Sequence, residues 1–187
     1  MKKNIVIIFF MLIVVSGCNI FQTRSPEEPS ANGNSYIPAT TPDILFANFK
    51  NSFSEKVVEN YIATFVDNAT LKKKYVFVPA AGALTKFPGL SDWTINSERL
   101  YFTNLVSLSG NNPIQIQLLN KSGSVQGDSA IFSYDYIVTL PFTKNKFEGS
   151  ARFTIFLDNR NLWFITKWED FEKTGFQSWS EIKGKYN

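Results

Sequence analysis

The sequence predicts an α+β domain in which N-terminal helices pack on one face of a curved antiparallel sheet of about four to five strands. Apolar residues recur at helical spacing through the first half of the chain. In the second half they alternate with polar residues, and short turn sequences separate the alternating runs. Helices followed by a meander of strands are typical of this class rather than of a parallel α/β sheet.

Two helices are expected at the start of the domain. Thr41 and Pro42 mark the beginning of the first, as an N-cap residue and a first-turn proline. Its apolar face repeats every four residues, at Leu45, Phe49 and Phe53. Ser54 is expected to cap a second helix that ends at Asp67.

The middle and the end of the chain contain further short elements. Residues 75–78 favour a short strand, and residues 79–93 a loop that is long for a compact domain. Residues 97–108 return to helical spacing. Residues 178–186 are expected to form a capped segment that packs onto the domain through Trp179 and Ile182.

Four antiparallel strands are expected in the second half. Residues 114–118 alternate as a half-buried strand, and residues 123–128 supply a turn. Residues 158–161 form a tight hairpin turn before a last strand over residues 162–171. The two central strands have one apolar face, made of Ala130, Phe132, Tyr134, Tyr136, Val138, Leu140, Phe147, Ala151, Phe153, Ile155 and Leu157.

The N-terminus has the pattern of an export signal. Lys2 and Lys3 precede an apolar run of 11 residues, Ile5 to Val15. As a helix this run would span only ~17 Å, too short for a bilayer core of ~30 Å, so it fits the h-region of a signal peptide. The residues that follow, Val15-Ser16-Gly17-Cys18, resemble the bacterial lipobox. This resemblance implies removal of residues 1–17 and covalent lipidation of Cys18.

The predicted organisation is therefore a signal peptide (1–17), a lipidated cysteine with a polar tether (18–40), and one α+β domain (41–187). Pro26, Pro29 and Pro38 lie among Ser, Asn, Gly and Glu in the tether. The lipid predicts a location in the cell envelope, with the membrane as a partner. In a Gram-negative host, Asn19 after the cysteine would favour the outer membrane.

Composition excludes several kinds of site. One cysteine and no histidine exclude an internal disulfide, cysteine-based zinc sites and Cys-His catalysis. Losing Lys2 and Lys3 would leave 17 basic against 16 acidic residues, so the net charge of about +1 predicts no nucleic-acid partner. The basic run at residues 72–74 is typical of a solvated turn. Turn chemistry explains the oxygen-rich residues 158–161 better than calcium binding does, and we expect no metal and no cofactor.

Three segments of the domain resemble the NTF2-like (cystatin-like, SnoaL-like) superfamily. They are "ENYIATFVD" at the end of the helix pair, "NSERLYFTNL" in the middle helix and "LDNRNLWFITKWED" at the close of the meander. The resemblance covers roughly residues 41–171. It implies a cone-shaped fold with a pocket between sheet and helices. Members of the superfamily include isomerases, dehydratases and cyclases, and many only bind ligands or partners.

No position can be matched to a catalytic residue of that superfamily. Asp135 and Arg152 lie on the polar faces of neighbouring strands, where a cross-strand ion pair is expected. An aromatic set is a candidate either for the lining of the cone pocket or for plain core: Tyr134, Tyr136, Phe153, Trp163 and Trp168.

Three classes of function stay open. The leading expectation is a non-catalytic binding or scaffolding domain on a lipid anchor, with a protein partner. The alternatives are a carrier of an apolar small molecule in the cone pocket and an isomerase or dehydratase. A buried, desolvated carboxylate lining a pocket would favour an enzyme, and a dry aromatic cavity a carrier. A cone filled by side chains, together with an exposed apolar patch, would favour partner binding.

Overall fold

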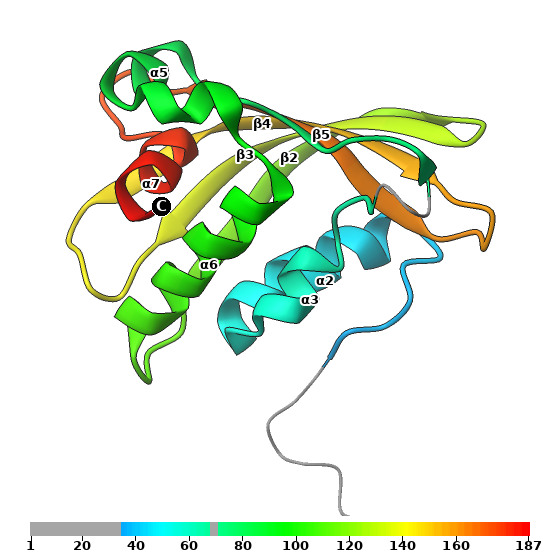
Figure 1. Cartoon of the computed structure of the whole chain (residues 1–187), viewed down its shortest axis with the longest axis horizontal. Helices are drawn as coiled ribbons and strands as arrows, with labels where there is room; N and C mark the ends of the chain where they lie inside the picture. Colours follow the sequence, from blue (N-terminus) through cyan, green and yellow to red (C-terminus); the bar gives the residue numbers. More distant parts are fainter. Residues whose placement is uncertain (1–34, 68–70) are drawn as a thin grey trace, which may run out of the picture. The chain divides into compact units, whose positions relative to one another are not determined.

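A curved five-stranded sheet forms one layer of the domain, and helices cover one of its faces (Figure 1). The computed structural model describes residues 35–67 and 71–187. The order in the sheet is β1-β5-β4-β3-β2, in which β2 to β5 are antiparallel and β1 runs parallel to β5. The strands are β1 (Val76–Val78), β2 (Gln115–Gln126), β3 (Ser129–Thr139), β4 (Lys146–Leu157) and β5 (Trp163–Glu172). The predicted α+β class is confirmed.

The register of the central strands confirms the predicted apolar face. Phe132 of β3 lies opposite Phe153 of β4, and Tyr134 lies opposite Ala151. All four are buried, and so is Ile155, because alternation sends every second side chain to the helix-covered side.

The predicted turn at residues 123–128 is wrong in its first part. β2 continues to Gln126, and only Gly127 and Asp128 connect it to β3. Gly123 stays within the strand at a φ of +135°. A Cβ there would lie 2.0 Å from the carbonyl oxygen of Ile131, so this glycine permits a close approach of the two backbones rather than a turn.

The first helix begins where the sequence predicts, but the second does not. α2 (Pro42–Glu55) follows Thr41, whose Oγ1 accepts a hydrogen bond from the amide of Ile44 at 3.3 Å. Ser54 does not cap a second helix, because α2 runs through it to Glu55 and has Lys56 as its C-cap, with a φ of 58°. The second helix, α3 (Val58–Ile62), is short and has no side-chain cap.

The predicted long loop contains two short helical segments. They are α5 (Ala81–Lys86) and the 3₁₀ helix η2 (Pro88–Asp92), so the expectation of a structureless connection at residues 79–93 is wrong. α6 (Ile95–Ser109) then starts two residues earlier than predicted. Thr94 and Ser97 form a capping box there, which satisfies the first-turn amides locally.

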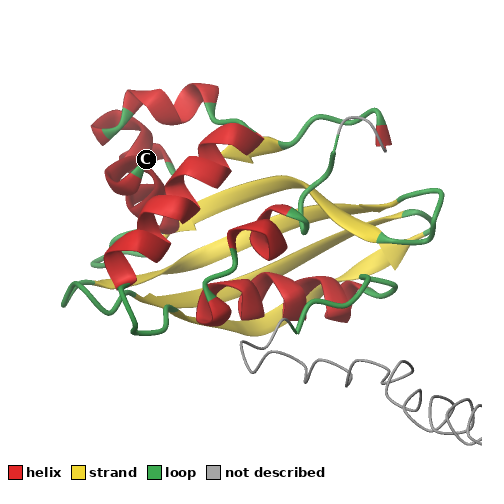
Figure 2. Cartoon of the chain, turned by 60° about the horizontal axis from the view of Figure 1, so that its bottom comes forward, coloured by secondary structure: helices red, strands yellow, loops and turns green. Residues whose placement is uncertain are grey.

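The C-terminal helix α7 (Trp179–Tyr186) packs where the sequence predicts (Figure 2). Ser178 accepts a hydrogen bond from the amide of Glu181 at 3.4 Å and caps it. Trp179 and Ile182 are fully buried, which confirms the predicted packing. α7 contacts α5, η2 and α6 as well as β4 and β5, and so joins the helical layer to the sheet.

The predicted signal peptide, Cys18 and most of the predicted tether lie outside the described residues. Within the described part of the tether, Asn48 of α2 donates to the carbonyl oxygen of Ile37 at 2.6 Å, and Ala39 is buried. None of the helices within residues 35–67 and 71–187 is long and apolar enough to cross a bilayer.

Candidate functional site

All five aromatic residues singled out in the sequence are buried. Phe153 and Trp168 lie in contact, with ring centroids 5.1 Å apart. Tyr136 joins them through Trp179 of α7, which packs against both Tyr136 and Trp168. Tyr134 lies farther along β3, 4.9 Å from the ring of Phe46, and Trp163 lies at the start of β5. Their role in lining a ligand pocket stays a prediction.

A buried ion pair lies between the helices. Glu98 of α6 and Lys183 of α7 are both fully buried and form a salt bridge. The second carboxylate oxygen of Glu98 accepts a hydrogen bond from the Tyr61 hydroxyl at 2.7 Å. The oxygen that faces Lys183 also accepts one from the Tyr75 hydroxyl, at 2.5 Å. Glu98 is thereby surrounded by three donors.

Lys183 has aromatic neighbours on its other sides. Its Nζ lies 3.7 Å from the ring centroid of Trp168 and 3.9 Å from that of Phe77, in the range of cation–π contact. Burial lowers the pKa of Lys183 to about 8, against the favourable effect of Glu98 on its charged form. Burial likewise raises the pKa of Tyr61 and of Tyr75 well above the ordinary value, so both hydroxyls stay protonated as donors.

A second buried carboxylate, Asp170 of β5, ties α7 to the sheet. One of its oxygens accepts from the Tyr136 hydroxyl at 2.8 Å. The other accepts from the amide and the hydroxyl of Ser180, at 2.7 and 2.5 Å. The Tyr136 hydroxyl also accepts from the amide of Trp179 at 2.7 Å. Burial raises the pKa of Asp170, and the hydrogen bonds from Ser180 and Tyr136 oppose that rise.

These contacts describe a filled interior. Trp179, Ser180, Ile182 and Lys183 of α7 occupy the space between the sheet and α6, and each is no more than 1 % exposed. Both buried carboxylates have donors on each oxygen. Glu98 and Asp170 therefore form their hydrogen bonds and ion pair with other residues of the fold.

The predicted ion pair between Asp135 and Arg152 is wrong. Asp135 lies opposite Ser150 in the register and accepts hydrogen bonds from Asn120 at 2.7 Å and from Ser150 at 3.0 Å. Arg152 lies opposite Glu169 of β5 and binds it through two bonds of 2.8 Å. Asp135 is exposed on the outer face of the sheet, away from the helices.

The hairpin at residues 158–161 is stabilised by hydrogen bonds from backbone amides to the side chain of Asp158. One oxygen of Asp158 accepts from the amides of Arg160 and Leu162, both at 2.9 Å. Asp158 is 4 % exposed, so these bonds offset its burial. In the part of the chain that the structure describes, no group of three or more Cys, Asp and Glu side chains is arranged to hold a metal ion.

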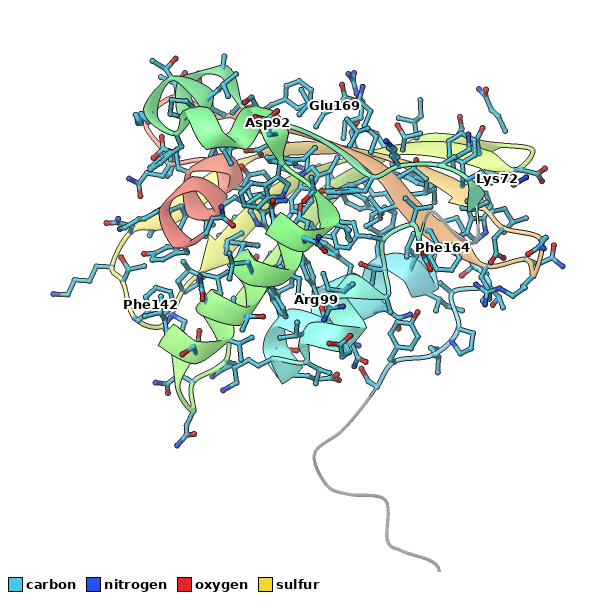
Figure 3. All side chains as sticks on the ribbon, viewed as in Figure 1. Lys72, Asp92, Arg99, Phe142, Phe164 and Glu169 are labelled. Atoms are coloured by element: carbon cyan, nitrogen blue, oxygen red, sulfur yellow. The ribbon has the colours of Figure 1, made fainter. Side chains whose placement is uncertain are left out.

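An open pocket of about 850 Å³ lies beside the filled interior, and we call it the lateral pocket. Its walls come from α3, the start of α6, the β4–β5 hairpin and the segments on either side of residues 68–70. Its apolar wall consists of Ile62, Phe65, Val66, Ile95, Leu162 and Phe164. Its charged groups are Glu59, Asp67, Lys74, Arg99 and Arg160. Figure 3 labels Arg99 on α6 and Phe164 on β5.

The charges of the lateral pocket are partly paired. Arg99 forms a salt bridge with Glu59, and its hydrogen bond lowers the pKa of that carboxyl. Arg160 pairs with Asp158 at 2.7 Å. Lys74 is exposed and forms no ion pair within the described residues. Tyr75 contributes its ring to the pocket while its hydroxyl bonds Glu98.

Sequence analysis missed the lateral pocket. Its residues come from segments far apart in the chain, and Lys74 was expected only in a solvated turn. It also missed Glu98 and Lys183, because a charged residue on an amphipathic helix is ordinarily assigned to the solvent side.

Comparison with known proteins finds similar folds among solved structures only. No protein-family model matches the sequence, and no curated protein gives a significant match. A single-residue variant of Rv3472, a protein of unknown function from Mycobacterium tuberculosis, is similar at 14 % identity and a TM-score of 0.50. The match covers 68 % of this chain and 66 % of that one, just under two thirds. A candidate scytalone dehydratase from Novosphingobium aromaticivorans matches at 10 % identity and a TM-score of 0.50, over 68 % of this chain and 78 % of its own.

Other matching structures are named for the fold. One is a protein of unknown function with a cystatin-like fold from Nostoc punctiforme, at 15 % identity and a TM-score of 0.49, over 71 % of this chain and 88 % of its own. Likenesses at this level of identity concern the fold alone. Two proteins described as NTF2-like, from Streptomyces avermitilis and Pseudomonas putida, also match with TM-scores of 0.49.

Proposed function

We propose that this chain is a lipid-anchored, non-catalytic binding protein that holds a small-molecule ligand in the lateral pocket. The observation that carries the proposal is the contrast between two regions. The interior between sheet and helices is occupied by α7, whereas the lateral pocket opens beside it with a volume of about 850 Å³. That volume lies within the ~300–1,000 Å³ range of small-molecule sites.

The filled interior argues against a catalyst in the cone. A general acid or base has to reach a substrate proton, but Glu98 and Asp170 are enclosed and do not line the lateral pocket. The Tyr75 hydroxyl faces Glu98, so the pocket receives only its ring. The same filling argues against a carrier that would use the cone pocket.

The anchoring half of the proposal rests on the sequence. A lipobox pattern ending at Cys18 and a polar tether would place the domain near a membrane surface. A non-catalytic domain at that place would act by holding its ligand at the cell envelope.

Native mass spectrometry of the protein purified from the membranes of its own bacterium tests the pocket. The wild-type protein should release a non-covalently bound small molecule on denaturation. Ala63→Trp should abolish it, because Ala63 lines the lateral pocket and a bulky ring there would fill it. Asn96→Trp should act in the same way from the first turn of α6.

The matched control is Ala81→Trp, at an exposed position in α5 outside the pocket, which should keep the bound molecule. Thermal melts check that all three variants fold. A wild-type protein without a bound molecule, or variants with a blocked pocket that still release it, would refute the proposal.

A further inference from the structure

The charges of the lateral pocket indicate which ligand it fits. Three cationic side chains line it, from three separate segments: Lys74 before β1, Arg99 in α6 and Arg160 in the β4–β5 hairpin. Two anionic side chains line it, Glu59 and Asp67. The side chains that line the pocket therefore carry one more positive than negative charge. The three cations come from segments that are far apart in the sequence and are brought together by the fold.

The pairing of these cations leaves donors for a ligand. A guanidinium has five N–H donors. Glu59 takes a hydrogen bond from one terminal nitrogen of Arg99, and Asp158 faces Nε and one terminal nitrogen of Arg160. Asp158 also accepts two backbone amides and lies outside the pocket. Lys74 forms no ion pair in the portion of the chain described by the structure, so its ammonium has the weakest competition.

The apolar part of the lining favours a flat apolar body. Phe65 and Val66 are buried at 3 and 4 % exposure, and Phe164 closes the wall from β5. The guanidinium of Arg160 lies 5.9 Å from the ring centroid of Phe164, and an aromatic surface beside cationic groups fits a molecule with a ring at one end and an acid at the other.

We infer that the lateral pocket binds a small organic anion, with an aromatic or other flat ring against Phe65 and Phe164 and a carboxylate or phosphate toward Lys74, Arg99 and Arg160. This inference rests on the proposed function and adds the chemical class of the ligand.

A matched pair of probes tests it: 2-naphthoate, which is an anion, and 2-naphthamide, which has the same ring system without the charge. Isothermal titration of the full detergent-solubilised chain should show 2-naphthoate binding about tenfold more tightly at low salt. The difference should shrink as salt screens the partly exposed charges. Ala63→Trp should abolish binding of both probes to the pocket. Its titration then measures the heat that comes from the probes entering the detergent.

Lys74→Gln should weaken 2-naphthoate about fivefold and leave 2-naphthamide unchanged, since Lys74 is exposed and forms no ion pair within residues 35–67 and 71–187. Lys50→Gln makes the same charge change at an exposed position of α2 outside the pocket and should alter neither affinity.

The outcomes separate the two proposals. Equal affinities for the two probes, both lost in Ala63→Trp, would overturn the anion inference and leave the pocket as a binding site. Binding of both probes that Ala63→Trp does not reduce would contradict the pocket itself. No binding of either probe to the wild type would overturn the ligand class inferred here.

Discussion

Replacing Lys183 with methionine should lower the free energy of unfolding by about 3–5 kcal/mol, the usual cost of leaving one member of a buried ion pair alone. Methionine retains an unbranched apolar chain, so packing against Trp168 and Phe77 changes little. Glu98 stays fully buried with only the hydroxyls of Tyr61 and Tyr75 as donors. Against a total stability of roughly 5–15 kcal/mol, this loss is large.

The double mutant isolates the effect of charge. Glu98→Gln alone leaves the buried Lys183 ammonium without its ion-pair partner, with only the more distant Asp170 carboxylate to favour its charge, and should also cost several kcal/mol, on the order of 3–5. Combining it with Lys183→Met removes both charges. The double mutant should then be more stable than Lys183→Met alone, with a remaining loss of about 1 kcal/mol for each weakened hydrogen bond.

Equilibrium urea unfolding at pH 7, followed by tryptophan fluorescence, measures the four stabilities. Lys86→Met is the control, because the Lys86 side chain is 60 % exposed and its salt bridge with Glu181 lies at the surface. Its unfolding midpoint should stay close to that of the wild type. A loss of under about 1 kcal/mol for Lys183→Met would refute the reasoning. So would a double mutant whose loss equals the sum of the two single losses, since independent sites add.

Three further predictions concern the anchor, the sheet and the outer face. Cys18→Ser should move the protein from the membrane to the soluble fraction in fractionation and immunoblotting, and a mutant that stays bound would contradict the lipobox prediction. Trp163→Ala should cost about 3–5 kcal/mol because its side chain is buried, and the exposed Asp135→Asn under about 1 kcal/mol; equal shifts in paired thermal melts would reject that difference. The hydrogen bond from Arg152, with Lys167 nearby, holds the pKa of Glu169 at about 2, so its contribution to stability is complete above its ordinary pKa of 4.5 and is lost as the pH falls toward 2; in acid unfolding, Glu169→Gln should lack the part of the stability loss that protonation of Glu169 causes, and an acid-unfolding profile identical to that of the wild type would contradict this prediction.

Strand periodicity could be predicted from the sequence because it depends on local alternation. Phe132, Tyr134, Phe153 and Ile155 lie in the core as expected, since a shift of one residue would expose all of them. The partner of a strand residue depends on the register with two neighbours. Arg152 therefore pairs with Glu169 of β5, which sequence analysis did not consider.

Short helical elements were harder to predict. The segment over residues 79–93 has Gly82, Pro88 and Gly89, which indicate a loop by composition. Its helical turns form because the surrounding structure holds them: the hydroxyl of Ser180 in α7 accepts from the amide of Ala80 at 2.9 Å, directly before α5. Tertiary contact overrides local propensity here.

The candidate site could not be predicted for the same reason. The fold brings together Lys74, Arg99 and Arg160 from positions up to 86 residues apart in the chain. No spacing rule connects them, whereas Cys18 belongs to a continuous pattern that can be read directly.

The contacts of α7 with residues made much earlier limit the order in which the domain can form during synthesis. Glu98, the partner of Lys183, is made 85 residues earlier. Ser180 forms hydrogen bonds with Asp170 and with Ala80, and Ala80 is made 100 residues before it. Until α7 has left the ribosome, folding would bury two carboxylates that lack their partners from α7. The contacts that join α5, α6 and the sheet to α7 can therefore form only after α7 has been made.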